Sequence, residues 1–139
     1  MKYIKRFESN IDDYEEYFSV LRSRHDSIKD RVEKLKELIG RNVDINSKND
    51  YNWTPILLIA DMIGTPSDDM KTLLELVIDS GADWSQKLIG PYDLTLYKPD
   101  FIDLLKKRGK NKLVDEIIKK YPEKYQEYLM KKNAEKYNL

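Results

Sequence analysis

The stretch that decides the fold of this chain is Trp53-Thr54-Pro55-Ile56-Leu57-Leu58-Ile59-Ala60-Asp61-Met62-Ile63-Gly64. Thr54 can cap a helix, because its hydroxyl accepts a free backbone N–H of the first turn. Pro55 suits the first helical position, where the missing N–H costs nothing. An apolar run follows, and Gly64 can end it in a left-handed conformation. The stretch therefore predicts one short apolar helix.

A second apolar run spans residues 70–78 and leads into Ser80-Gly81-Ala82-Asp83. Together the two runs resemble one repeat of the ankyrin family, whose core reads Thr-Pro-Leu-His-x-Ala. Leu57 stands where the family has His, and Ile59 where it has its first Ala. The resemblance implies that Leu57 binds the neighbouring repeat by packing alone. Gly64 and Gly81 are separated by about five residues more than in the family, which places residues 65–69 between the two helices.

Two further segments resemble weaker copies of the same repeat. Residues 32–39 and Asn42-Val43-Asp44 resemble the second half of a first repeat, with Asn42 at a position that needs positive φ. Residues 100–109 and 111–121 resemble the two helices of a third, with Asp100 in place of the capping Thr. Pro122 can open a last helix, whose lysines suit the polar outer face of a terminal repeat.

The resemblance implies an all-α fold, an ankyrin-type helical repeat solenoid of about three irregular repeats with finger loops and a C-terminal capping helix. Residues 1–139 would form a single domain. Its repeats would occupy residues 1–46, 47–83 and 84–121, and the capping helix residues 122–139.

Helical periodicity also marks the first part of the chain. Apolar residues recur every three or four positions at Ile4, Phe7, Ile11, Tyr14, Phe18 and Leu21. Asn10 and Asp13 could form a capping start inside this stripe, so the pattern allows one helix or two. Ser27 is a further N-cap candidate. The helix after it is expected to present one face made of Ile28, Val32, Leu35 and Ile39.

Composition excludes several classes of protein. The chain has no Cys, which excludes disulfides, thiolate metal sites and Cys nucleophiles. No apolar run is long enough to span a bilayer, and the first residues lead into acidic ones rather than into a signal peptide. We therefore expect a cytoplasmic protein without a membrane partner.

Charge is unevenly distributed, although the formal net charge is zero. From Lys106 to the end there are eleven Lys/Arg and five Asp/Glu, so this part is basic and residues 1–105 are acidic. The two parts are either ordinary solvated helix faces or binding faces that attract partners of opposite charge.

No catalytic constellation stands out. His25 is the only His and lies in a polar turn, which favours a surface position. Asp12, Asp13, Glu15 and Glu16 suit the first turn of a helix, where acidic residues stabilise the helix dipole. The chain has neither a Gly-rich phosphate loop nor metal-ligand spacing. We expect no enzymatic activity, no cofactor and no metal.

Binding candidates come from the two expected finger loops, from the end of the helix that starts at Pro55, and from the segment after this helix. They are Tyr51, Asn52, Trp53, Asp61, Met62, Asp68, Asp69, Leu88, Ile89 and Tyr92. Trp53 could be an exposed anchor or could pack on the neighbouring finger. Trp84 is expected in the core, because it stands where the family has a half-buried Val.

The resemblance implies a stand-alone protein-binding module. Because the whole chain is expected to be the repeat domain, we expect it to inhibit or neutralise a partner protein, as immunity proteins and viral counter-defence factors do. The acidic first 105 residues favour a basic partner. The rival hypothesis is nucleic-acid binding through the basic C-terminal third. The oligomeric state stays open.

Overall fold

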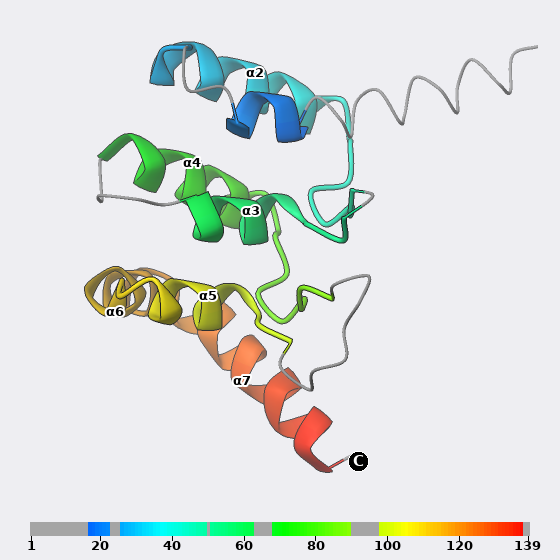
Figure 1. The fold of residues 1–139 in the computed structure, drawn as a ribbon, viewed down its shortest axis with the longest axis vertical. Coiled ribbons are helices and arrows are strands. Elements are labelled where there is room, and N and C mark those ends of the chain that lie inside the picture. Colours follow the sequence, from blue (N-terminus) through cyan, green and yellow to red (C-terminus); the bar gives the residue numbers. More distant parts are fainter. Residues whose placement is uncertain (1–16, 23–25, 50, 63–67, 90–97, 138–139) are drawn as a thin grey trace, which may run out of the picture. The chain divides into compact units, whose positions relative to one another are not determined.

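The computed structural model describes residues 17–22, 26–49, 51–62, 68–89 and 98–137 (Figure 1). Every regular element among these residues is a helix, which confirms the all-α prediction. Residues 17–22 are helical, and six labelled helices follow: α2 (Ile28–Gly40), α3 (Pro55–Met62), α4 (Asp68–Asp79), α5 (Phe101–Lys107), α6 (Asn111–Lys120) and α7 (Pro122–Tyr137). The chain divides into two compact units, one ending at Ala82 and the other beginning at Asp83.

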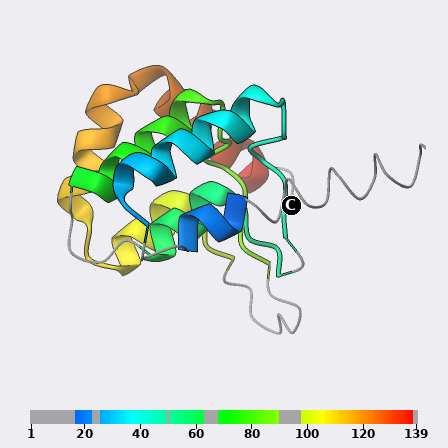
Figure 2. The same cartoon turned by 90° about the horizontal axis from the view of Figure 1, so that it is seen from above.

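The core of the first unit is built around α3. All residues from Pro55 to Ala60 are buried, so this helix is enclosed on every side. It packs against α4, which in turn packs against α2 (Figure 2). The apolar side chains that α4 buries are Leu73, Leu74, Val77 and Ile78. A helix that is apolar all round is stable only in such a position.

The start of α3 confirms the sequence prediction. Thr54 is fully buried, and its hydroxyl accepts the backbone N–H of Leu57 at 3.5 Å. Pro55 is the first helical residue. The predicted end at Gly64 lies outside the described residues.

Helix α2 begins as predicted but buries a different face. Ser27 is its N-cap and accepts the N–H of Asp30 at 3.2 Å. Of the four expected inward residues only Leu35 is buried, whereas Ile28, Val32 and Ile39 are half-buried. The expected face is therefore wrong in part: the buried side chains of the helix are Arg31, Leu35 and Leu38.

Arg31 is buried, and its guanidinium donates to two backbone carbonyls of another helical segment. Its Nε donates to the carbonyl of Val20 at 3.1 Å, and an Nη donates to the carbonyl of Leu21. Both carbonyls belong to helical residues 17–22. Tyr17, Phe18 and Leu21 of the same segment are buried, as expected for Phe18 and Leu21.

The start of α4 corrects the expected insertion between the two helices. The helix begins at Asp68, so Asp68 and Asp69 are its first residues rather than part of a loop. Residues 65–67 lie outside the described part of the chain.

Left-handed residues end two of the helices where predicted. Asn42 after α2 has φ 61° and Gly81 after α4 has φ 97°. Each donates its N–H to a carbonyl of the preceding helix, that of Ile39 and that of Ile78, both at 3.0 Å. The turns that lead out of these helices therefore have the same backbone form.

The core of the second unit is aromatic. Trp84 is buried, as expected, and its ring makes edge contacts with Phe101 at 5.6 Å and with Tyr121 and Tyr128 at 6.4 Å between centroids. Helix α6 adds Leu113, Val114 and Ile117 to the buried side chains. Helix α7 begins at Pro122, as predicted.

Several predictions concern residues outside the described ranges. They are the stripe positions before Phe18 with the question of one helix or two, the acidic residues 12–16, His25 and Tyr92.

Candidate functional site

The loop that precedes α3, residues 47–53, is called the first finger here. Asn49 fastens it with both its backbone and its side chain. Its N–H donates to the carbonyl of Trp53 at 2.9 Å, and its carbonyl accepts the N–H of Asn52 at 3.0 Å. Its side-chain Oδ1 accepts the N–H of Tyr51 at 2.9 Å and that of Trp53 at 3.0 Å.

Asn52 completes the turn of the first finger. It has φ 66°, a left-handed conformation that Asn adopts more readily than most residues. Four hydrogen bonds and this conformation hold the described residues of the finger in one shape. Asn side chains commonly form such turns by accepting a hydrogen bond from the backbone N–H two residues later.

The first finger presents Tyr51 to solvent. The ring is 67% exposed, a high value for a large aromatic side chain, whereas Trp53 beside it is half-buried. Trp53 is thus neither a free anchor nor a core residue. Exposed aromatic side chains on an ordered backbone are common anchors of protein interfaces.

The other predicted residues of the first unit lie around α3 and α4. Asp61 and Met62 are half-buried at the C-terminal end of α3, while the first finger leads into its N-terminal end. A helix of eight residues is about 12 Å long, so these two residues lie about that far from the finger. Asp68 and Asp69 open α4.

Two predicted residues belong to the second unit. Leu88 is half-buried, and its N–H donates to the carbonyl of Pro99 at 2.8 Å. Ile89 is 39% exposed. The predicted residues are therefore divided between two units, and within the first unit between the two ends of α3.

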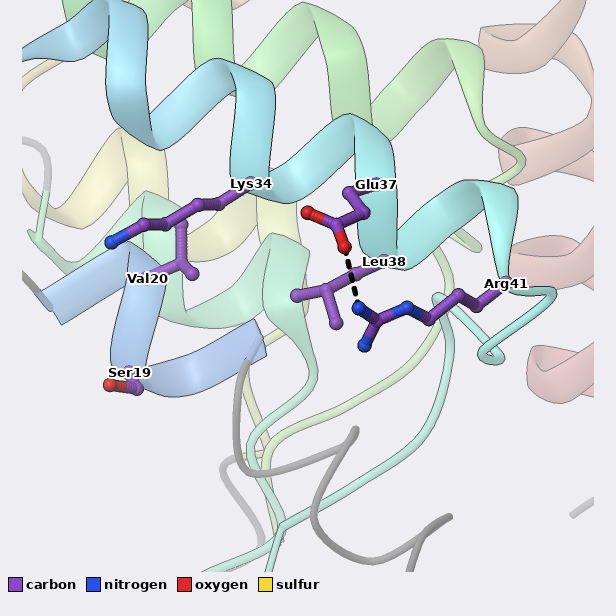
Figure 3. Close-up of a pocket in the computed structure, with 6 residues that line it drawn as sticks. All are labelled: Ser19, Val20, Lys34, Glu37, Leu38 and Arg41. Carbon is purple, nitrogen blue, oxygen red and sulfur yellow. Dashed lines mark hydrogen bonds and ion pairs between the residues drawn. The ribbon is translucent and has the colours of Figure 1, made fainter.

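The first unit also contains a hollow of about 290 Å³ that sequence reasoning did not anticipate (Figure 3). Its lining residues are Ser19, Val20, Lys34, Glu37, Leu38 and Arg41. Glu37 and Arg41 form an ion pair one helical turn apart, and Lys34 lies 3.4 Å from Asp26. The i, i+4 spacing of Glu37 and Arg41 was the only signal in the sequence. The charged side chains that line the hollow are already paired.

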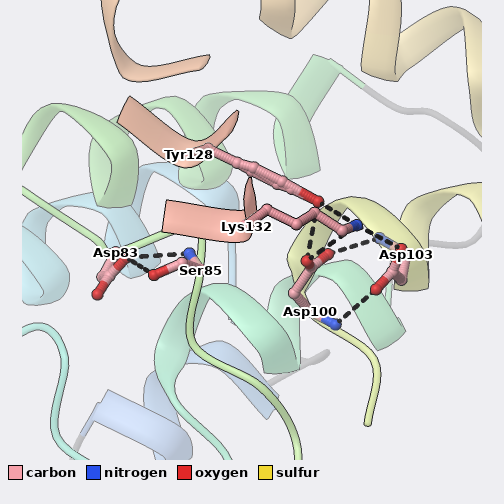
Figure 4. A network of polar contacts seen from close by, with 6 residues as sticks. All are labelled: Asp83, Ser85, Asp100, Asp103, Tyr128 and Lys132. Atoms are coloured by element: carbon pink, nitrogen blue, oxygen red, sulfur yellow. Dashed lines mark hydrogen bonds and ion pairs between the residues drawn. The ribbon is translucent and has the colours of Figure 1, made fainter. Parts of the chain in front are cut away.

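A polar network in the second unit joins the start of α5 to α7 (Figure 4). Lys132 donates to the hydroxyl of Tyr128 at 2.9 Å, and this hydroxyl donates to Asp100 at 2.8 Å. Asp100 also accepts the N–H of Asp103 at 2.9 Å, and Asp103 accepts the N–H of Asp100 at 3.2 Å. The two carboxylates thus form a capping box for α5, as expected for Asp100.

Burial controls the protonation of this network. It raises the pKa of Asp100, which is only 2% exposed, even though Asp103 N–H, Tyr128 and Lys132 stabilise the charged carboxylate. Burial also raises the pKa of the Tyr128 hydroxyl, and its bond to Asp100 adds to this. For Lys132 burial acts in the other direction, but its bond to Tyr128 and the charge of Asp100 outweigh burial and raise its pKa. The network stabilises the fold rather than binding a ligand, because the Asp100 carboxylate is buried.

A second carboxylate of this unit behaves differently. Asp83 accepts the N–H of Ser85 at 2.9 Å and its hydroxyl at 2.7 Å, and Lys131 of α7 lies 3.3 Å away. Burial alone would raise the pKa of Asp83, but the bonds from Ser85 and the charge of Lys131 lower it overall. Lys131 therefore pairs with Asp83, whereas the adjacent Lys132 lies 3.7 Å from Asp100 and 3.5 Å from Asp103.

The described residues contain no group of three His, Asp or Glu side chains placed to hold a metal ion. No helix among them combines the length and the apolar character that crossing a membrane would need.

Comparisons with protein-family models, with curated proteins and with solved structures found no match for this chain. Its function must therefore be inferred from its own side chains.

Proposed function

We propose that this chain is a protein-binding module that holds its partner through the first finger, with Tyr51 as the apolar anchor. The observation that supports this is a side chain that is 67% exposed on a loop fastened by four hydrogen bonds. An aromatic ring in water gains free energy when a partner covers it.

The fastening of the loop is as important as the ring. Binding costs free energy when a mobile loop has to be ordered, so a loop already held in one shape binds more tightly through the same contacts. The bonds that Asn49 makes to Tyr51 and Trp53 hold the loop in this way.

The finer form of the proposal is an ankyrin-type solenoid that neutralises a partner protein, in the manner of an immunity protein or a viral counter-defence factor. It is supported by the Thr54-Pro55 helix start and by the left-handed residues Asn42 and Gly81. These follow α2 and α4, which would be the second helices of two successive repeats. In this form Asp61, Met62, Asp68 and Asp69 extend the contact on the first unit, and the acidic charge favours a basic partner.

The test compares Tyr51→Ala with Met130→Ala. Met130 of α7 is 71% exposed, so it is a matched large side chain from the other unit. We expect affinity capture followed by mass spectrometry to recover a protein with the wild type and with Met130→Ala, but not with Tyr51→Ala. Surface plasmon resonance should then show a faster off-rate for Tyr51→Ala, equivalent to about 2 kcal/mol.

The control is the thermal unfolding of both variants, which should match the wild type because both side chains are exposed. Equal capture by all three proteins would contradict the proposal, since the ring would then contribute nothing to binding.

A further inference from the structure

The turn between α5 and α6 carries a dense group of cations, and we call residues 106–112 the basic turn. It reads Lys106-Lys107-Arg108-Gly109-Lys110-Asn111-Lys112. Lys110 is half-buried and the rest of the turn is exposed. Gly109 has φ 73° and lets the chain reverse direction between the two helices. Five cations therefore lie on one short exposed segment.

Helix stability explains only the first part of this group. Lys106 and Lys107 lie in the last turn of α5, where the negative end of the helix dipole favours cations. Lys110 and Lys112 lie at the start of α6, where the positive end of the dipole repels them. The first turn of α6 has no acidic residue, and Lys110 makes no side-chain capping bond. These two lysines thus reduce the stability of the helix that they begin.

Charges placed against the local rules of helix stability are expected at functional positions. The basic turn also lacks any apolar side chain. A protein interface needs an apolar anchor at its centre, and a surface that inserts into a membrane needs apolar side chains too. Asp115 and Glu116 are exposed one helical turn later and confine the positive surface to the turn. Lysine acts as a point charge that binds phosphate without a fixed orientation.

We infer that the basic turn binds the phosphate backbone of a nucleic acid, without reading its sequence. This surface belongs to the second unit and the first finger to the first unit. Since the partner class also differs, either proposal can fail while the other holds.

The test uses a variant of the basic turn and a control of equal charge. The first is Lys106→Gln/Lys110→Gln/Lys112→Gln, and the second is Lys98→Gln/Lys119→Gln/Lys124→Gln, which removes three lysines elsewhere in the same unit. Fluorescence anisotropy with a labelled DNA duplex and with an RNA duplex of the same sequence measures binding over a series of salt concentrations.

We expect wild type and control to bind with a steep salt dependence. The variant of the basic turn should bind about ten-fold or more weakly at low salt, with a slope lower by about 0.9 for each lysine removed. A larger effect on one duplex than on the other identifies DNA or RNA as the preferred source of the phosphates.

Equal weakening of both variants would overturn the inference, because net charge alone would then explain binding. Binding to vesicles of anionic phospholipid or to polyglutamate, but to neither duplex, would overturn it in favour of a membrane or an acidic protein. Lysine acetylation of the wild-type protein gives a test without substitutions. The duplex should protect Lys106, Lys110 and Lys112 from the reagent, and their unchanged reactivity would contradict the inference.

Discussion

The first turns of α3 and α5 are each capped by a buried side chain, but the two capping groups differ in their chemistry. Both helices begin at a buried capping residue that follows a loop, Thr54 for α3 and Asp100 for α5. Thr54 is neutral and makes one long bond of 3.5 Å to the helix. Asp100 is a carboxylate, and it receives bonds from Asp103 and from Tyr128 of α7.

The difference shows what a buried carboxylate requires. A neutral hydroxyl can be buried with one partner, whereas a charge removed from water needs several donors or a cation. Tyr128 and Lys132 provide these from α7, at 2.8 Å and 3.7 Å from Asp100. Helix α7 is therefore tied to the start of α5 through Asp100, and no equivalent tie is needed at α3.

The largest expected effect comes from Asp100→Ala. This change removes the cap of α5, which is typically worth about 1 kcal/mol, and leaves the buried Tyr128 hydroxyl without its acceptor, which costs about 1–3 kcal/mol. We expect the free energy of unfolding to fall by about 3 kcal/mol in chemical denaturation.

Tyr128→Phe separates the two contributions, because it removes the hydrogen bond between α7 and Asp100 and leaves Asp100 as the N-cap of α5. The free energy of unfolding should therefore fall by less than in Asp100→Ala. If Tyr128→Phe were as damaging as Asp100→Ala, the cap itself would contribute nothing.

Thr54→Ala should have a smaller effect, since the bond from Leu57 to Thr54 is long and no other helix depends on it. We expect a loss of about 1 kcal/mol, measured by the same denaturation. Thr54→Ser is the matched control and should retain most of the stability. A loss at Thr54 that exceeds the loss at Asp100 would reverse the comparison.

The smallest expected effect is a dependence on pH. Burial raises the pKa of Asp100 above its ordinary value of 3.8, so the folded state binds this proton more tightly than the unfolded state. The resulting stabilisation is full below about pH 4 and is lost as the pH rises through the raised pKa. Wild type should therefore be more stable relative to Asp100→Asn at pH 4 than at pH 7, as followed by melting temperature.

Asp83 provides the opposite control, because its pKa is lowered overall. Its stabilisation is present above its ordinary pKa and is lost as the pH falls. The difference between wild type and Asp83→Asn should therefore persist from pH 7 to pH 4 and shrink only when the pH falls below the ordinary value of 3.8. The same direction of change for both carboxylates would contradict the assignment of Asp100.

Local signals in the sequence predicted the helix starts well. Ser27, Thr54-Pro55, Asp100 and Pro122 all begin helices where expected, because capping depends on residues within one turn. The left-handed positions Asn42 and Gly81 were predicted for the same reason.

Interactions between distant residues could not be predicted in this way. No signal near Arg31 in the sequence indicates its burial, which depends on carbonyls ten and eleven residues earlier. The bond between Tyr128 and Asp100 spans 28 residues. Among the site residues, the residue type and position of Tyr51 indicate binding. The hydrogen bonds from the loop backbone to Asn49 could not be predicted without the conformation of the loop. The basic turn was visible only as excess charge until its helix ends were known.

The positions of the two tryptophans give this protein a separate optical reporter for each unit. Trp84 lies buried among three aromatic rings in the second unit, and Trp53 lies half-buried at the base of the first finger in the first. The emission of an indole depends on the polarity around it, so Trp84 should emit at shorter wavelength than Trp53. Replacing one indole at a time by Phe would leave a single emitter in the chain. Whether the two units melt together or one after the other can then be read from fluorescence alone.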